Sequence, residues 1–332
     1  LTKVSYSAYI IPNLIKDNTE SIDTLSQYLS ISKKSIQKKI NKKSSFVWLK
    51  RHCSQSLMNQ VTALNIKGVK FLPEQKRLYP NSELACHVIG FVGVDSQGLS
   101  GIEYGWDDLL KGDPGKMILE GDPRGVQLIS GTKVIKEAQH GGHVVTSLDR
   151  YIQYLTEKVL RETIHDTQAT GGYAVVMLPK TGEILALASL PNFDLNNWSN
   201  EDAFSFNNPG ASDVFEPGSV LKIITLAGVL NEEIMTPDTI LTVPEELVLY
   251  GKKIKESHER DEEETDQKSV TDIITYSLNV GTTLMSEQLG EQMLYKYYKY
   301  FGIGEKTGAN IVGESSGLFR ELKNWSKIDY AT

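Results

Sequence analysis

The chain has 332 residues, which is more than one ordinary domain holds and about the length of two. Hydrophobic residues make up 40% of it and charged residues 23%, and this balance excludes collagen-like, low-complexity and wholly disordered proteins. A formal charge of −7 argues against a nucleic-acid partner, because such proteins present a basic surface. Two cysteines are too few for a disulfide framework or a zinc knuckle.

Roughly the first 70 residues are polar and rich in lysine. Apolar residues at helical spacing predict a helix over residues 21–29, and Ser32 is placed to cap a second helix over residues 32–40. Residues 46–49 predict a short strand. The second helix carries four lysines, Lys33, Lys34, Lys38 and Lys39. We interpret them as a solvated face rather than as a site for a polyanion or a lipid.

Glycine and proline are frequent between residues 78 and 125. This pattern favours small strands joined by turns over a helical bundle. Residues 107–110 predict a short helix within this region.

The pattern changes after Gly141. Residues 149–163 have the spacing of an amphipathic helix. Two strand-like runs follow, over residues 172–178 and 183–189, and the residues between them suit a tight turn. We therefore expect a hairpin and a sheet that is at least partly antiparallel.

Beyond Phe215 the chain reads as mostly helical. Three helices are predicted, over residues 219–230, 269–277 and 280–290, and Ser269 with Asp272 forms a capping signal for the second. The acidic stretch over residues 256–266 is expected to be an exposed loop.

The strongest chemical signal is Ser219-x-x-Lys222, directly after Pro217-Gly218. The Pro-Gly pair breaks the chain before an apolar helix, so Ser219 should lie at the helix N-terminus with Lys222 one turn later on the same face. The helix is apolar on every side and is expected to be buried, which would disfavour a charged lysine and allow it to accept a proton. A serine beside such a base can act as a nucleophile. A capping serine with a solvated lysine explains most isolated S-x-x-K patterns, but the Pro-Gly break and the apolar helix favour catalysis here.

A second pattern is Ser277-x-Asn279. Two residues apart, these side chains do not share a helix face, so they must project together from the junction of two helices. A hydroxyl and an amide on one loop can relay a proton and hold a peptide group. Alone the pattern is weak, since ordinary turn chemistry also explains it.

Other kinds of site have little support in the sequence. It contains no H-E-x-x-H, G-x-S-x-G, Walker or G-x-G-x-x-G motif. His140 and His143 are the only close histidine pair, which gives slight support to a metal site and none to a Ser-His-Asp triad.

Ser219-x-x-Lys222 followed by Ser277-x-Asn279 is the motif order of penicillin-recognising serine enzymes. The chain resembles the class B penicillin-binding proteins in further segments, from about Glu74 to Thr332. Residues 77–80 (Arg-Leu-Tyr-Pro), 87–93 and 98–103 are similar to the non-catalytic pedestal of that family, and the glycine-rich block at 98–103 is similar to its division-associated branch.

This resemblance implies an α/β (α+β) transpeptidase fold, with an antiparallel sheet flanked by helices. It implies a β-rich pedestal domain over residues 1–140 and a transpeptidase domain over residues 141–332, incomplete at its C-terminus. The chain begins without methionine and ends without a helix stop, so we expect a fragment. No apolar run reaches the ~18–20 residues that span a bilayer. The family location, the periplasmic face of the bacterial inner membrane, would thus depend on an N-terminal anchor absent from this chain.

The resemblance also assigns roles. Ser219 would attack the D-Ala–D-Ala carbonyl of a peptidoglycan stem peptide, and Lys222 would take its proton. Ser277 would pass the proton to the leaving amine, and Asn279 would hold the substrate amide. No metal or organic cofactor is implied. The implied partners are stem peptides, β-lactam antibiotics, a glycosyltransferase and division proteins, with no nucleic acid.

The family has a third motif, Lys-Thr/Ser-Gly, on a strand beside the nucleophile. Lys306-Thr307-Gly308 matches its letters, but the glycines around it predict a loop, and Lys180-Thr181-Gly182 falls in the hairpin turn. We therefore expect the true motif to lie beyond Thr332, and this chain alone to acylate poorly.

Three alternatives remain open. A serine β-lactamase or a β-lactam sensor would use the same nucleophile, although a lactamase needs no N-terminal pedestal. A non-catalytic wall scaffold would keep the fold without the chemistry.

Overall fold

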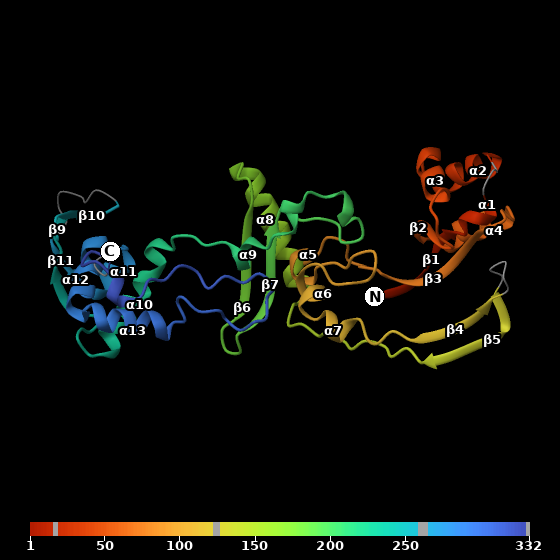
Figure 1. Ribbon diagram of the computed structural model, residues 1–332. Helices are drawn as coiled ribbons and strands as arrows, with labels where there is room; N and C mark the ends of the chain where they lie inside the picture. Colours follow the sequence, from red (N-terminus) through yellow and green to blue (C-terminus); the bar gives the residue numbers. More distant parts are fainter. Residues whose placement is uncertain (16–18, 122–126, 258–264, 330–332) are drawn as a thin grey trace. The chain divides into compact units, whose positions relative to one another are not determined.

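The computed structural model describes residues 1–15, 19–121, 127–257 and 265–329 (Figure 1). The chain forms two compact units, Leu1–Gly210 and Ala211–Thr332, whose boundary falls in α9 (Pro209–Ser212). Within the described ranges, no helix is both long and apolar enough to cross a membrane.

The N-terminal part of the first unit is a three-stranded antiparallel sheet in the order β2-β1-β3. Its elements are β1 (Thr2–Ile10), α1 (Pro12–Ile15), α2 (Thr19–Leu29), α3 (Lys33–Ile40), β2 (Val47–Cys53), α4 (Gln55–Ala63) and β3 (Val69–Arg77). Buried aliphatic side chains from the sheet and helices form one core, including Ile10, Leu25, Leu29, Ile36 and Val61.

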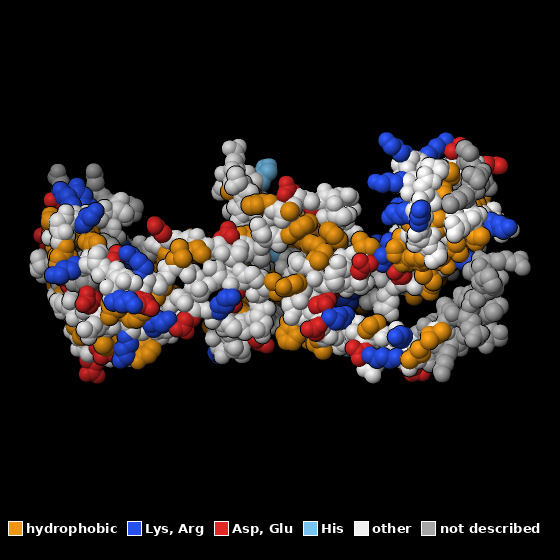
Figure 2. All heavy atoms as spheres, in the orientation of Figure 1, with side chains coloured by type: hydrophobic (Ala, Val, Ile, Leu, Met, Phe, Trp, Pro, Cys, Tyr) orange, Lys and Arg blue, Asp and Glu red, His pale blue; other side chains and the backbone are white. Residues whose placement is uncertain are grey.

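The two helices and the strand predicted in this region are confirmed as α2, α3 and β2. Ser32 caps α3 by accepting the N–H of Ser35. Three of the four α3 lysines are exposed, as a solvated face requires. Figure 2 shows Lys and Arg side chains on the surface of this part of the first unit. Lys39 is half-buried and donates to the Leu49 carbonyl at 2.8 Å.

Strand β1 was not predicted, because its polar residues face inward. Ser5 and Ser7 are buried, whereas Val4 is 64% exposed. The Ser5 hydroxyl donates to the Glu74 carbonyl at 3.1 Å, and the Ser7 hydroxyl accepts the His52 N–H at 3.0 Å. These hydrogen bonds allow the two hydroxyls to be buried. Because serines occupy the inward-facing positions, β1 lacks the alternation of apolar and polar residues that predicts a strand.

In its described residues the glycine-rich region forms one strand, β4 (Lys116–Gly121), where its sequence favours several. It contains three short helices, α5 (Cys86–Ile89), α6 (Gly101–Gly105) and α7 (Asp107–Leu110), and only α7 was predicted. The glycines let backbone segments touch. A Cβ atom on Gly90 would lie 1.9 Å from the Ser100 carbonyl oxygen, and Gly90 has a φ of +72°.

Two of the pedestal-like segments meet in an ion pair. Arg77 lies 2.6 Å from the carboxylate of Glu103, whose side chain is almost fully buried. The chain then forms a hairpin of β4 (Lys116–Gly121) and β5 (Gln127–Lys136).

Helix α8 (Arg150–Thr167) and the antiparallel hairpin of β6 (Gly172–Leu178) and β7 (Glu183–Leu190) confirm the predicted helix and hairpin. However, α8 buries Gln153 and Glu157, while the apolar Leu155 and Val159 are about half exposed. The Gln153 amide makes paired bonds with the Leu187 backbone, at 2.8 and 3.0 Å, and so docks the helix on β7. The 3₁₀ turns η1 (Trp198–Asn200) and η2 (Ala203–Phe206) follow.

The second unit is a helical cluster with two short antiparallel strand pairs, β9–β10 and β8–β11. Its elements are η3 (Gly218–Leu221), α10 (Lys222–Asn231), β8 (Ile240–Thr242), β9 (Glu246–Leu249), β10 (Lys252–Lys255), β11 (Gln267–Ser269), α11 (Val270–Thr275), α12 (Asn279–Leu289), α13 (Glu291–Tyr300) and η4 (Leu322–Asn324). The three predicted helices are confirmed as η3 with α10, α11 and α12, and Ser269 forms the predicted capping box with Asp272.

The expectation that the helix after Ser219 is buried on every side is wrong. Ile224, Thr225, Gly228 and Val229 are buried, but Val220 is 68% and Ile223 is 53% exposed. The buried residues recur at helical spacing on the side that packs against α12 and α13, and the exposed residues lie on the opposite side.

The close approach at Gly90 gives a testable prediction. Gly90→Ala should lower the free energy of unfolding of the first unit by about 3 kcal/mol or more, since it adds a backbone clash to the positive-φ penalty. Gly182→Ala is the matched control: Gly182 has a φ of +78° with nothing within 4 Å of its Cβ position. This control should cost about 1–2 kcal/mol in urea titrations. Equal losses for the two variants would contradict the close approach.

Candidate active site

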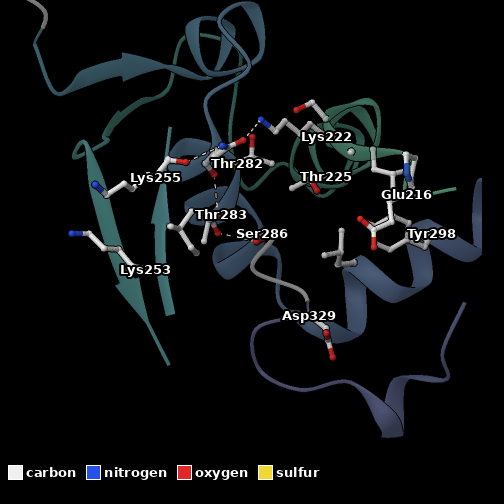
Figure 3. Close-up of a pocket in the computed structure, with 17 residues that line it drawn as sticks. Glu216, Lys222, Thr225, Lys253, Lys255, Thr282, Thr283, Ser286, Tyr298 and Asp329 are labelled. Atoms are coloured by element: carbon white, nitrogen blue, oxygen red, sulfur yellow. Dashed lines mark hydrogen bonds between the residues drawn. The ribbon is translucent and has the colours of Figure 1, made fainter. Parts of the chain in front are cut away.

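A cleft of about 540 Å³ lies in the second unit, lined by residues of η3, α10, β10 and α12 (Figure 3). Three of the four predicted site residues line it: Ser219, Lys222 and Asn279. Its other polar lining residues include Thr225, Thr282, Thr283 and Ser286.

Ser219 lies in η3, a 3₁₀ turn that leads directly into α10. Gly218, with a φ of +60°, starts this turn after Pro217. In a 3₁₀ turn, side chains three residues apart point the same way, which places Ser219 and Lys222 on one side. Ser219 is exposed, and its hydroxyl has no hydrogen-bond partner among the described residues. The predicted position at the start of the helix is therefore confirmed.

The Lys222 ammonium group binds three oxygen atoms at the start of α12. It donates to the Ser277 carbonyl at 2.6 Å, to the Ser277 hydroxyl at 3.1 Å and to Asn279 Oδ1 at 2.7 Å. Figure 3 shows Lys222 extending from α10 toward this junction. Partial burial lowers the pKa of Lys222, and the negative charge of Glu256 opposes this effect.

Ser277 and Asn279 project from the junction between α11 and α12, as predicted. Ser277 has a φ of +53°, in the left-handed region that costs a non-glycine residue roughly 1–2 kcal/mol. This conformation accompanies the contact of both its carbonyl and its hydroxyl with Lys222. The Asn279 amide nitrogen donates to the Lys255 carbonyl at 2.8 Å, so both ends of the amide are held.

Sequence reasoning missed one residue that contacts this junction. Glu256 was expected in an exposed acidic loop, of which residues 258–264 lie outside the described residues. Instead, Glu256 is half-buried, and its carboxylate accepts the N–H groups of Asn279 at 2.5 Å and Val280 at 3.1 Å. The only signal was negative: Leu278, which precedes α12, has no side chain that can cap a helix.

Neither Lys-Thr-Gly segment lies on a strand. Lys306-Thr307-Gly308 is in an irregular loop after α13, as predicted, where the Thr307 N–H donates to Glu314 at 2.7 Å. Lys306 does not line the cleft. Lys180-Thr181-Gly182 is in the β6–β7 turn.

His140 and His143 are both exposed. Among the residues that the structure describes, no three His, Cys, Asp or Glu side chains are grouped so that they could hold a metal ion.

The chain matches two family models. One is the penicillin-binding protein dimerisation domain, over residues 2–146, and the other is the penicillin-binding protein transpeptidase domain, over residues 172–332. The family match therefore also covers the residues before Glu74, where the sequence motifs gave little resemblance.

Curated relatives and solved structures agree with these matches. The chain is 32% identical to the probable peptidoglycan D,D-transpeptidase PenA of Neisseria gonorrhoeae, covering 100% of this chain and 57% of that one. It is also 32% identical to the peptidoglycan D,D-transpeptidase FtsI of Escherichia coli K12, covering 88% and 48%. The chain thus spans about half the length of the curated relatives it matches.

Penicillin-binding protein 3 of Mycobacterium tuberculosis is 30% identical to the chain, with a TM-score of 0.66 over 78% of this chain and 54% of that one. The Helicobacter pylori PBP2 in complex with MreC has a TM-score of 0.78 at 22% identity, over 100% and 68%. This second likeness shows the fold alone.

The loop position of Lys306 gives a prediction for penicillin acylation of the full-length protein. Lys306→Ala should change the acylation rate by about twofold or less, as for surface substitutions in general. Asn279→Ala should reduce it by ~10²-fold, since it removes a group held at the cleft. Stopped-flow measurement of acylation distinguishes the two. A large loss in a folded Lys306→Ala protein would show that this Lys-Thr-Gly segment belongs to the site.

Proposed function

Because the chain belongs to the class B penicillin-binding proteins, we propose that it carries the nucleophile and proton-transfer groups of a peptidoglycan D,D-transpeptidase. Such an enzyme cross-links stem peptides through an acyl-enzyme intermediate on a serine. Penicillin acylates the same serine. The observation that carries the proposal is the triple contact of Lys222 with Ser277 and Asn279, in the cleft that Ser219 also lines.

In the first step, Ser219 Oγ forms a bond to the carbonyl carbon of the penultimate D-alanine. The Ser219 proton passes to the Lys222 amine, which must be neutral to accept it. Partial burial, which lowers the pKa of Lys222, supports this role. The C–N bond to the terminal D-alanine then breaks, and its nitrogen receives the proton through the Ser277 hydroxyl.

In the second step, an amine from a neighbouring stem attacks the ester carbonyl. The bond between the carbonyl carbon and Ser219 Oγ breaks, and the proton of the attacking amine returns to Ser219 by way of Lys222. Asn279 holds the substrate amide throughout. The hydrogen bond between Lys222 Nζ and Ser277 Oγ, 3.1 Å, supports a direct proton path between these two groups.

We assign residues 1–140 to a pedestal domain and residues 141–332 to the transpeptidase domain. The ranges of the two family models support this division. The dimerisation-domain match also favours a transpeptidase over a serine β-lactamase, which has no need of such a domain. The assembled contacts of Lys222 favour an active site over a non-catalytic scaffold.

We further propose a septal role on the periplasmic face of the bacterial inner membrane, with a glycosyltransferase and division proteins as partners. The similarity of residues 98–103 to the division-associated branch of the family supports the septal role. The complex of Helicobacter pylori PBP2 with MreC shows that a protein of this fold binds a protein partner.

The nucleophile is tested by substitution. Ser219→Ala in the full-length protein should abolish covalent labelling by fluorescent penicillin, because no other hydroxyl can replace Ser219 at the start of α10. Ser316→Ala, an exposed serine of the same unit, is the control and should label normally. Labelling of a folded Ser219→Ala protein at another serine would overturn the assignment.

The base is tested by a change that keeps the charge. Lys222→Arg should acylate at least ~10²-fold more slowly than the wild type, because arginine stays protonated at any usable pH and cannot accept the proton. Lys252→Arg, on β10 and outside the cleft lining, is the matched control and should acylate normally. If Lys222→Arg acylates at a near-normal rate, Lys222 acts only as a positive charge.

A further inference from the structure

We propose that Glu256 is a positioning residue of this site: its carboxylate holds the first turn of α12 and thereby fixes Ser277 and Asn279 against Lys222. The inference rests on the proposed function, because it concerns the residues that carry the transpeptidase chemistry. It assigns a role to a residue outside the sequence motifs.

Helix α12 lacks a cap of its own. The first N–H groups of any helix have no partner within the helix, and a side chain at the N-cap position usually binds one of them. Here the N-cap residue is Leu278, which makes no side-chain cap, and the hydroxyl of Ser277 accepts a bond from Lys222. Glu256, 23 residues upstream of Asn279, binds two of the free N–H groups instead. A carboxylate at this end of the helix is also favoured by the helix dipole.

The segment that contains Glu256 is itself anchored. It directly follows β10, which pairs with β9 along its whole length, and Ile254 of β10 is buried in the core of this unit. The adjacent Lys255 carbonyl accepts the Asn279 side-chain amide. Asn279 is thus held at three atoms: its backbone N–H by Glu256, Nδ2 by Lys255 and Oδ1 by Lys222. These three contacts fix the orientation of the Asn279 side chain.

Glu256 also acts on Lys222 through its charge, which raises the pKa of the lysine against the effect of burial. The other charged groups that line the cleft are Glu216, Lys253, Lys255 and Asp329. Both lysines lie on β10, where each is paired with Glu246, at 2.5 and 3.7 Å. Removal of the Glu256 charge should therefore lower the pKa of Lys222 further.

The test compares Glu256→Gln with Glu246→Gln in the full-length protein. Both changes remove one negative charge near β10, but the Glu246 carboxylate binds Lys253 and Lys255 rather than the first N–H groups of α12. The rate constant for acylation of Ser219 by penicillin is measured from pH 5 to pH 10, and Tm is measured for each protein.

We expect Glu256→Gln to lower the plateau rate by ~10- to 100-fold, the loss that a small misplacement of catalytic groups causes. Because acylation needs neutral Lys222, the rate rises with pH through the lysine pKa, and this rise should move to lower pH in the variant. Glu246→Gln should keep both the plateau and the position of the rise. Glu256→Asp, whose shorter carboxylate keeps the charge, should restore the position of the rise and part of the rate.

Two results would overturn the proposal. One is a Glu256→Gln protein that acylates like Glu246→Gln. The other is a rate loss that disappears at a temperature where the variant is fully folded, with no shift of the pH profile, which would show a structural role only. If Glu256→Gln does not fold, Glu256→Asp is compared with Glu246→Asp: the Glu256 variant should acylate more slowly with the rise at an unchanged pH, and equal rates in the two proteins would overturn the proposal. Failure of the wild type to acylate at Ser219 would instead contradict the proposed function.

Discussion

The ammonium group of Lys222 lies against three oxygen atoms from Ser277 and Asn279, and this contact joins the helix that carries Ser219 to the start of α12. A half-buried cation needs acceptors to replace the water it has lost. Val229 of α10 and Val280 and Met285 of α12 belong to one buried core, and this core holds the two helices together. The packing brings the two helices together, and the polar contact selects which residues of each face one another.

The start of α12 is arranged so that its polar groups are already bound before any substrate arrives. Thr282 and Thr283 donate back to the carbonyls of Leu278 and Asn279, at 2.8 and 3.0 Å, and Glu256 binds the first N–H groups of the helix. Ser277 is held in a left-handed conformation that faces Lys222. Ser219 differs from these residues, because its exposed hydroxyl has no partner in the described part of the chain. The nucleophile is thus left free, while the groups around it are fixed.

The sequence correctly predicted the features that depend on interactions between residues close together in the chain. The Pro-Gly break before Ser219, the Ser269–Asp272 capping box and the β6–β7 hairpin are all present as expected. Features that depend on distant contacts were missed or misread. Ser5 and Ser7 are buried by partners on β2 and β3, the glycines near residue 90 permit backbone contacts in place of strands, and Glu256 caps a helix 23 residues away. The family resemblance predicted that Ser219 and Ser277 lie in one site. Their spacing in the sequence does not predict this.

The proposed mechanism requires that Ser219 is the acylated residue and that Lys222 remains bound to Ser277 and Asn279 beside it. A crystal structure of the full-length protein after reaction with penicillin tests both parts at once. The account predicts an ester bond at Ser219 Oγ, with Lys222 Nζ still within hydrogen-bond distance of Ser277 Oγ and Asn279 Oδ1. An adduct on any other residue, or a Lys222 side chain turned away from Ser277 into solvent, would contradict it.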